Sequence, residues 1–159
     1  MQKFDRTHHK ALWEYMAQEK TINDIINEAV TKCASCLSFG EMYYVIVDSV
    51  YDKKKEFIVQ NRRLYDDIPI NCCYACKTSC GEDIIHNCYG CPIDLKGYCE
   101  EDNSEYVTKG NLYDRYIKYI THIVMNPKKK DKYIKYIKQA QKMALQIANA
   151  KLRYEVEEI

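Results

Sequence analysis

Apolar residues recur at helical spacing close to the beginning of the chain. Leu12, Trp13 and Met16 fall on one face of a helix that is predicted over residues 8 to about 19. Thr7 directly precedes this segment and has the hydroxyl side chain that often caps a helix N-terminus. The first element is therefore predicted to be an amphipathic helix.

A second amphipathic helix is predicted from residue 21 onwards. Thr21 followed by Asp24 resembles a capping box. The apolar positions of the segment share one broad face: Ile22, Ile25, Ile26, Ala29, Val30 and Cys33. The helix is expected to end near residues 37–40, because Gly40 can adopt the left-handed conformation that closes many helices.

The middle of the chain carries patterns that are typical of strands and turns. Residues 42–50 are rich in β-branched and aromatic side chains and predict a strand, although so short a run also fits a buried helix. Residues 56–60 predict a second short strand. From residue 72 to residue 104, glycine and proline favour knuckles and turns.

Two helices are predicted towards the end of the chain. The first covers residues 112–125, and the second covers residues 128 to about 154. Asn126 and Pro127 fit an N-cap followed by proline in the first turn of the last helix. One stripe of that helix steps by four and three positions, as a buried face requires. Its members are Tyr133, Ile137, Ala140, Ala144 and Ile147.

One heptapeptide occurs twice in these helices. The first copy is Asp114-Arg-Tyr-Ile-Lys-Tyr-Ile120 and the second is Asp131-Lys-Tyr-Ile-Lys-Tyr-Ile137, offset by 17 residues. A single pair is too little for a solenoid, which needs about three repeats. We therefore expect two similar amphipathic helices that pack side by side.

Composition sets the broad class of the protein. The 159 residues fit one domain, and 47% hydrophobic residues with 30% charged residues are typical of a water-soluble protein. The longest apolar run, residues 42–47, is far shorter than the roughly 20 residues that cross a bilayer. The first twenty residues lack the apolar stretch of a signal peptide. We therefore expect a cytoplasmic protein with no membrane partner.

Nine cysteines are the most informative chemistry in the sequence. Cys73 with Cys76, and Cys88 with Cys91, form two C-x2-C pairs separated by eleven residues. Two residues between ligands let one tight turn direct both sulfurs at a single ion about 2.3 Å away, and two such turns complete a tetrahedron. Thiolate ligands favour zinc or iron–sulfur chemistry. The pattern predicts a structural zinc site, rather than reduced cysteines that pack as small hydrophobes.

The other five cysteines allow a second metal site. Cys33 and Cys36 are one helical turn apart, so that both sulfurs can face one point. With two of Cys72, Cys80 and Cys99 they make up a second ligand set. Thiol redox activity of the Cys33-Ala-Ser-Cys36 segment is the weaker interpretation. A helix C-terminus, where this pair is expected, disfavours a thiolate.

These patterns together predict a mainly α fold with a small zinc-knuckle or β element. Residues 1–40 are expected to form N-terminal helices, and residues 41–111 short strands and a cysteine-rich zinc-binding region. Residues 112–159 are expected to form a C-terminal helical hairpin. The three parts are expected to pack as one compact domain.

Several motifs resemble a group of short phage-encoded proteins, found mostly in phages of low-GC Gram-positive bacteria. The resemblance rests on the segment from His8 to Ala17, which contains His9, Leu12 and Trp13, and on three later motifs. These are Cys73-Tyr-Ala-Cys76, Cys88-Tyr-Gly-Cys91-Pro92 and Gly97-Tyr98-Cys99. It covers about the first twenty residues and residues 71–99. The resemblance implies a phage or prophage origin and adds Cys99 as a structural or ligating residue, but it implies no activity.

No catalytic motif is recognisable in the sequence. Metalloprotease, phosphate-loop, nucleophile-elbow and dinucleotide patterns are all missing from it. His8 and His9 are adjacent in a predicted helix and therefore point about 100° apart. The acidic segments 82–83 and 100–102 are expected in solvated loops. The chain is thus predicted to be a non-enzymatic interaction protein that binds a host protein, such as a component of bacterial defence.

An uneven charge distribution supports an alternative function. The net charge is only +1, but residues 109–142 contain ten basic and two acidic residues. The alternative is a zinc-knuckle regulator that binds nucleic acid through phosphate contacts and aromatic stacking. Its candidate residues are Lys128, Lys129, Lys130, Lys132, Tyr133, Lys135 and Tyr136. The tyrosine-rich helices also suit a homodimer interface.

Overall fold

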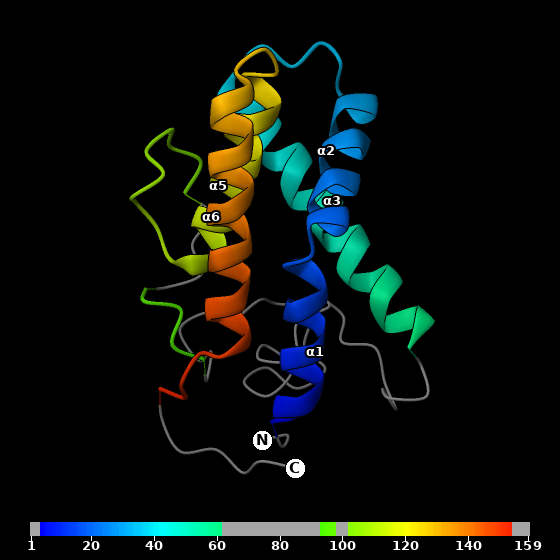
Figure 1. Cartoon of the computed structure of the whole chain (residues 1–159), viewed down its shortest axis with the longest axis vertical. Coiled ribbons are helices and arrows are strands. Elements are labelled where there is room, and N and C mark those ends of the chain that lie inside the picture. Colours follow the sequence, from blue (N-terminus) through cyan, green and yellow to red (C-terminus); the bar gives the residue numbers. More distant parts are fainter. Residues whose placement is uncertain (1–3, 62–92, 98–101, 154–159) are drawn as a thin grey trace.

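The fold is mainly α-helical. The computed structural model describes residues 4–61, 93–97 and 102–153 (Figure 1). Five helices are present in these ranges: α1 (Arg6–Met16), α2 (Glu19–Lys32), α3 (Phe39–Gln60), α5 (Leu112–Met125) and α6 (Lys130–Ala148). The only β pairing within the same ranges is an isolated antiparallel bridge between Ile93 and Leu152. The mainly α prediction is confirmed, while most of the predicted knuckle region lies outside the described residues.

The helices pack around one shared core. α5 and α6 run antiparallel and side by side, as the predicted C-terminal hairpin requires (Figure 1). α1 and α2 follow one another along the same side of the molecule, and α1 packs against α6. α3 passes behind them and contacts α1, α2 and α5.

Both predicted strands are wrong, because residues 42–50 and 56–60 belong to the 22-residue helix α3. The buried side chains of the first segment, among them Met42, Ile46 and Val50, recur at steps of four, which is helical spacing. Tyr44 between them is exposed. A β-branched and aromatic composition favours a strand only weakly, and burial of one helical face against α2 and α5 outweighs it here.

The α2–α3 connection also differs from the prediction. α2 ends at Lys32 rather than near residues 37–40, and Gly40 lies in the first turn of α3. Ser38 caps α3, since its hydroxyl accepts a hydrogen bond from the backbone N–H of Glu41 (3.1 Å). The chain therefore needs no left-handed glycine at this point.

Three other predicted helix starts are displaced. Asp5, not Thr7, caps α1 by accepting from the backbone N–H of His8 (3.0 Å). α2 already begins at Glu19, so that Thr21 lies buried inside the helix rather than at its cap. Asn126 ends α5 instead of starting α6, which begins at residue 130. At α1 the shift arises because several polar residues near a helix start can serve as caps, whereas α2 and α6 begin without a capping side-chain hydrogen bond.

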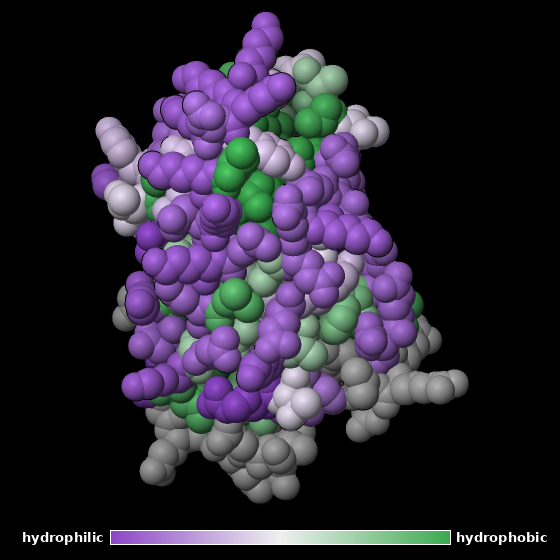
Figure 2. All heavy atoms as spheres, viewed as in Figure 1, coloured by the Kyte–Doolittle hydropathy of each residue, from purple (hydrophilic) through white to green (hydrophobic). Residues whose placement is uncertain are grey.

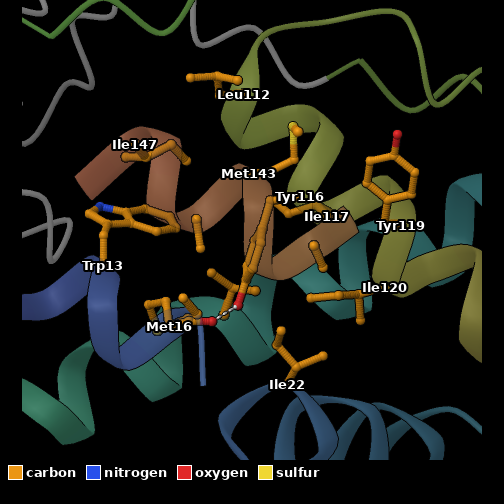
Figure 3. Packing of buried hydrophobic residues seen from close by; sticks show 14 of the residues in the cluster. Trp13, Met16, Ile22, Leu112, Tyr116, Ile117, Tyr119, Ile120, Met143 and Ile147 are labelled. Atoms are coloured by element: carbon orange, nitrogen blue, oxygen red, sulfur yellow. Dashed lines mark hydrogen bonds between the residues drawn. The ribbon is translucent and has the colours of Figure 1, made fainter. Parts of the chain in front are cut away.

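The core is centred on Tyr116 of α5 (Figure 3). Its hydroxyl donates to the backbone carbonyl of Met16 at the end of α1 (2.8 Å), and Trp13 meets its ring edge-on at 5.7 Å. Four of the five members of the predicted stripe of α6 are buried, namely Ile137, Ala140, Ala144 and Ile147, while Tyr133 is half-buried. Burying one large aliphatic side chain contributes roughly 1.5–3 kcal/mol, so that this core accounts for much of the fold's stability.

Candidate functional site

Most predicted metal ligands lie outside the described residues. These are the C-x2-C cysteines Cys73, Cys76, Cys88 and Cys91, together with Cys72, Cys80 and Cys99. Within residues 4–61, 93–97 and 102–153, no group of three or more His, Cys, Asp or Glu side chains is arranged to hold a metal ion. The zinc site therefore stays a prediction from the sequence.

Cys33 and Cys36 are described, and they form a disulfide. Cys33 is the C-cap residue of α2, and Cys36 lies in the linker to α3. Both side chains are half-buried and pack against the hydrophobic core. The two sulfurs meet at one point, as their spacing predicted, but they do so in a linker rather than on a helix.

The lysines of the basic segment lie on the outer face of α6 and the turn before it. All of them are exposed: Lys128, Lys129, Lys130, Lys132, Lys135, Lys138 and Lys142. Across the described part of the chain, no acidic side chain forms an ion pair with any of them. This face therefore presents a concentrated positive charge to an approaching partner.

The two tyrosines of the same segment face inwards. The Tyr133 hydroxyl donates to the side-chain oxygen of Asn23 on α2. The Tyr136 ring lies 5.4 Å from the ring of Tyr119 and 5.7 Å from that of His122, both on α5. Both tyrosines are half-buried. The rings predicted to stack on nucleic-acid bases are thus engaged in packing between helices.

Aliphatic side chains emerge among the lysines instead. Ile134 is 57% exposed and Leu145 is 44% exposed, both on α6. Apolar areas separated by polar side chains are visible on the face that carries α6 (Figure 2). Leu145 also borders a shallow, open groove whose other lining residues are Lys138, Gln141, Lys142, Gln146 and Asn149. Its described lining combines two ammonium groups, three amides and one aliphatic side chain.

A buried lysine that the sequence did not reveal holds residues 102–110 against α5. Lys118 is fully buried, and its ammonium donates to the carbonyl oxygens of Lys109 (2.8 Å) and Tyr106 (3.2 Å). It also donates to the Ser104 hydroxyl (3.2 Å) and pairs with the Asp102 carboxylate (3.1 Å). Asp102 was expected in a solvated loop, and it does lie in a loop with its side chain 35% exposed, where it also supplies the counter-charge that the buried ammonium needs.

A second buried polar group starts α5. Asp114 and Asn111 form a reciprocal capping box, with the Asn111 side chain accepting from the Asp114 N–H (2.9 Å). The Tyr43 hydroxyl donates to the Asp114 carboxylate (3.1 Å). Burial raises the pKa of Asp114 to about 6. Gly110 has φ +90°, and a Cβ there would lie 2.8 Å from the Cβ of Asp114, so that glycine is required.

The adjacent histidines have separate structural roles. His9 is buried, and its Nε2 lies 2.8 Å from the backbone carbonyl oxygen of Ile147 on α6. Burial lowers the pKa of His9 to about 4, which keeps the ring neutral near pH 7. His8 is half-buried and lies 2.8 Å from the Asp5 carboxylate. The two imidazoles point to different partners, as the helical spacing predicted.

Comparison with known protein families, with curated proteins and with solved structures finds no match for this chain. The resemblance to phage-encoded proteins therefore stays a prediction. Among the described helices, none combines the length and apolar character needed to cross a membrane. The surface chemistry of α6 and the cysteines are the features of this chain that bear on its function.

Proposed function

We propose that the chain is a non-enzymatic, cytoplasmic interaction protein that binds an acidic surface of a partner protein through the outer face of α6. The carrying observation is the combination of exposed lysines, which form no ion pair with any acidic residue that the structure describes, with two exposed aliphatic side chains, Ile134 and Leu145. Lysines steer an acidic partner and speed its association, while apolar anchors slow its dissociation. The resemblance to phage-encoded proteins supports a host protein, such as a component of bacterial defence, as this partner.

The side chains on this face favour a protein over a nucleic acid. Single-stranded nucleic acid is commonly held by stacking of bases on exposed aromatic rings. Here Tyr133 and Tyr136 face other helices, and the exposed apolar groups are aliphatic. Aliphatic side chains next to lysines suit a protein surface that carries both carboxylates and an apolar patch.

A matched pair of charge variants tests the proposed face. Lys138→Glu/Lys142→Glu reverses two charges at the groove, and Lys10→Glu/Lys55→Glu makes the same change on α1 and α3. Affinity capture from host lysate should recover one protein with the wild type and the α1/α3 variant, and lose it with the groove variant. Recovery by all three forms would contradict the proposed face, and recovery by none would contradict the proposed function.

Nucleic-acid binding is the second candidate, because seven exposed lysines lie within residues 128–142. Fluorescence anisotropy with labelled single- and double-stranded oligonucleotides would then show affinity that falls steeply with added salt. Leu145→Ser separates the two candidates, since it removes an apolar anchor without changing charge. It should weaken binding of a protein partner but leave binding to an oligonucleotide unchanged.

We also propose that Cys73, Cys76, Cys88 and Cys91 bind one structural zinc ion. The support is their spacing, since a closed four-thiolate set leaves no open position for catalysis. Elemental analysis of the purified protein should find one zinc ion per chain, and a chelator should lower the thermal stability. Two zinc ions per chain would indicate a second site with Cys33 and Cys36 among its ligands. Iron in place of zinc would indicate an iron–sulfur site with a redox function.

The homodimer expectation concerns the same helical face. A second copy of this chain would meet the basic face of α6 with like charge, which opposes close association. Light scattering should therefore give the mass of a monomer. A dimer that Ile134→Glu dissociates would show that α6 is a self-association surface instead.

A further inference from the structure

We infer that Cys33 and Cys36 form a reversible dithiol–disulfide pair that exchanges with small thiols and, in its oxidised form, locks the connection between α2 and α3. The inference rests on three features of residues 33–38. The two cysteines are held close by anchored helix ends, they are half-buried in a linker whose neighbouring residues are exposed, and they are joined in the structure.

The helix ends on both sides of the pair are fixed. At the end of α2, the Cys33 N–H donates to the carbonyl of Ala29 (3.0 Å), and Lys32 pairs with Asp52 of α3 (2.8 Å). At the start of α3, the Ser38 hydroxyl accepts from the backbone of Glu41. Because both attachment points are held, the Cα atoms of the cysteines stay near their separation of 5.5 Å, within the usual range for disulfides. The bond can therefore open and close without rebuilding either helix.

The surroundings of the pair are open to small molecules. Ala34 and Ser35, which lie between the cysteines, are exposed. Leu37, directly after them, is 89% exposed, and Val30 in the last turn of α2 is 49% exposed. Accessible disulfides in short surface segments are the ones that exchange with thiols, whereas deeply buried ones are inert.

The reaction is thiol–disulfide exchange with a small thiol such as glutathione. Its thiolate attacks one cysteine sulfur, so that a mixed disulfide forms, the Cys33–Cys36 bond breaks and the other cysteine leaves as a thiolate, which takes up a proton. A second glutathione then attacks the mixed disulfide, and the attached cysteine leaves as a thiol. In sum, the disulfide and two glutathione molecules give two cysteine thiols and one oxidised glutathione.

The position of Cys33 at a helix C-terminus does not oppose this exchange. The negative end of the helix dipole disfavours a thiolate at this position. Cys33 was therefore not expected to act as an activated nucleophile. In exchange with glutathione, however, the attacking thiolate comes from the small molecule. The chain needs to supply only an accessible disulfide and a dithiol held ready to close again.

The sequence offers a clean way to test the pair. Trypsin cleaves after Lys32 and Lys53, and the resulting peptide 33–53 contains Cys33 and Cys36 but none of the other seven cysteines. The native protein is equilibrated in glutathione buffers of varied ratio, acid-quenched, labelled with N-ethylmaleimide and digested. The peptide should pass reversibly from almost entirely disulfide to almost entirely doubly labelled as reduced glutathione increases.

Four results would overturn the inference. In the first, the peptide would stay doubly labelled in oxidised glutathione. In the second, it would keep its disulfide until the protein is unfolded. In the third, one of its cysteines would be found linked to a different cysteine of the chain. In the fourth, zinc shields both thiols from the label until a chelator is added, which would make them metal ligands.

The proposed lock needs its own measurement, which is hydrogen exchange of residues 33–38. Reduction should speed exchange there and leave α5 unchanged. The variant Cys33→Ser/Cys36→Ser should exchange as fast as the reduced protein and should not respond to glutathione. Equal hydrogen-exchange rates of residues 33–38 in the oxidised and reduced protein would contradict the proposed lock.

Discussion

The repeated heptapeptide of α5 and α6 is placed in opposite surroundings. In the α5 copy, six of seven residues are buried: Asp114, Tyr116, Ile117, Lys118, Tyr119 and Ile120. In the α6 copy only Ile137 is buried, although six of the seven residues are identical. Local sequence therefore makes both segments helical, but the neighbouring elements decide which side chains are buried.

The neighbours of the two helices explain the contrast. α5 packs against α2, α3 and α6, and Lys118 holds residues 102–110 over another of its faces. Among the described elements, α6 packs against α1, α2 and α5, and its lysines and Ile134 are exposed. Six residues of the α5 copy thus have an identical counterpart in the α6 copy, which allows the comparison to be tested pair by pair.

The largest difference is expected for the isoleucine pair. Ile117→Ala removes a fully buried side chain and should lower the free energy of unfolding by roughly 2–5 kcal/mol. Ile134→Ala, at a position 57% exposed, should change it by less than about 0.5 kcal/mol. Urea denaturation measures both. Similar losses in the two variants would show that something covers the outer face of α6 in the free protein.

The lysine pair should give the next largest difference. Lys118→Met keeps the length of the side chain but leaves Asp102 and two carbonyl groups without the ammonium, which should cost about 1–3 kcal/mol. Lys135→Met is expected to be nearly neutral, because Lys135 is exposed. Hydrogen exchange of residues 102–110 should speed up in the first variant alone. Unchanged exchange there would mean that Lys118 does not hold this segment.

Local patterns were sufficient where one helix face is buried and capped. The bounds of α5, residues 112–125, were predicted correctly from the pattern of apolar positions, and the structure adds a capping box of Asn111 and Asp114 at its start. Most of the buried stripe of α6 was also predicted, because its members recur at steps of four and three, although Ile134 and Leu145 are apolar and lie on the exposed face. The convergence of Cys33 and Cys36 also followed from their spacing.

Long-range packing decided the features that the sequence did not show. Residues 42–50 have a composition that fits either a strand or a buried helix, and contacts with distant α5 favour the helix. Lys118 looks like an ordinary solvated lysine, since its partners are backbone carbonyls and side chains of a preceding loop. Cys73, Cys76, Cys88 and Cys91, the predicted zinc ligands, lie outside the described residues, so the zinc site stays a prediction.

The aspartate pair should differ in its dependence on pH. Burial raises the pKa of Asp114 to about 6, so that between pH 4 and 6 the folded protein keeps a proton that the unfolded chain has lost. The contribution of Asp114 to stability therefore falls as pH rises through this window. Asp114→Asn removes the titrating carboxyl group. The free energy of unfolding of this variant, relative to that of the wild type, should therefore increase from pH 4 to pH 6 and then level off.

His9 makes this comparison with the wild type necessary. Its pKa is lowered to about 4, so that its contribution to stability rises with pH over much of the same window and partly hides that of Asp114. The difference between wild type and Asp114→Asn cancels the effect of His9. Asp131→Asn, at the exposed equivalent position on α6, should follow the wild-type curve. A pH-independent difference for Asp114→Asn would refute the raised pKa.

The tyrosine pair should give the smallest difference. Tyr116→Phe removes a buried hydrogen bond to Met16, which should lower the free energy of unfolding by about 1 kcal/mol. Tyr133→Phe removes a half-buried bond to Asn23, where water can replace the lost partner, and should cost less than about 0.5 kcal/mol. The shifts in urea midpoint measure both. Because the chemical change is identical, any difference between the two shifts reports only the surroundings of the hydroxyl group. Equal shifts would mean that the hydroxyl of Tyr133 contributes as much to stability as that of Tyr116.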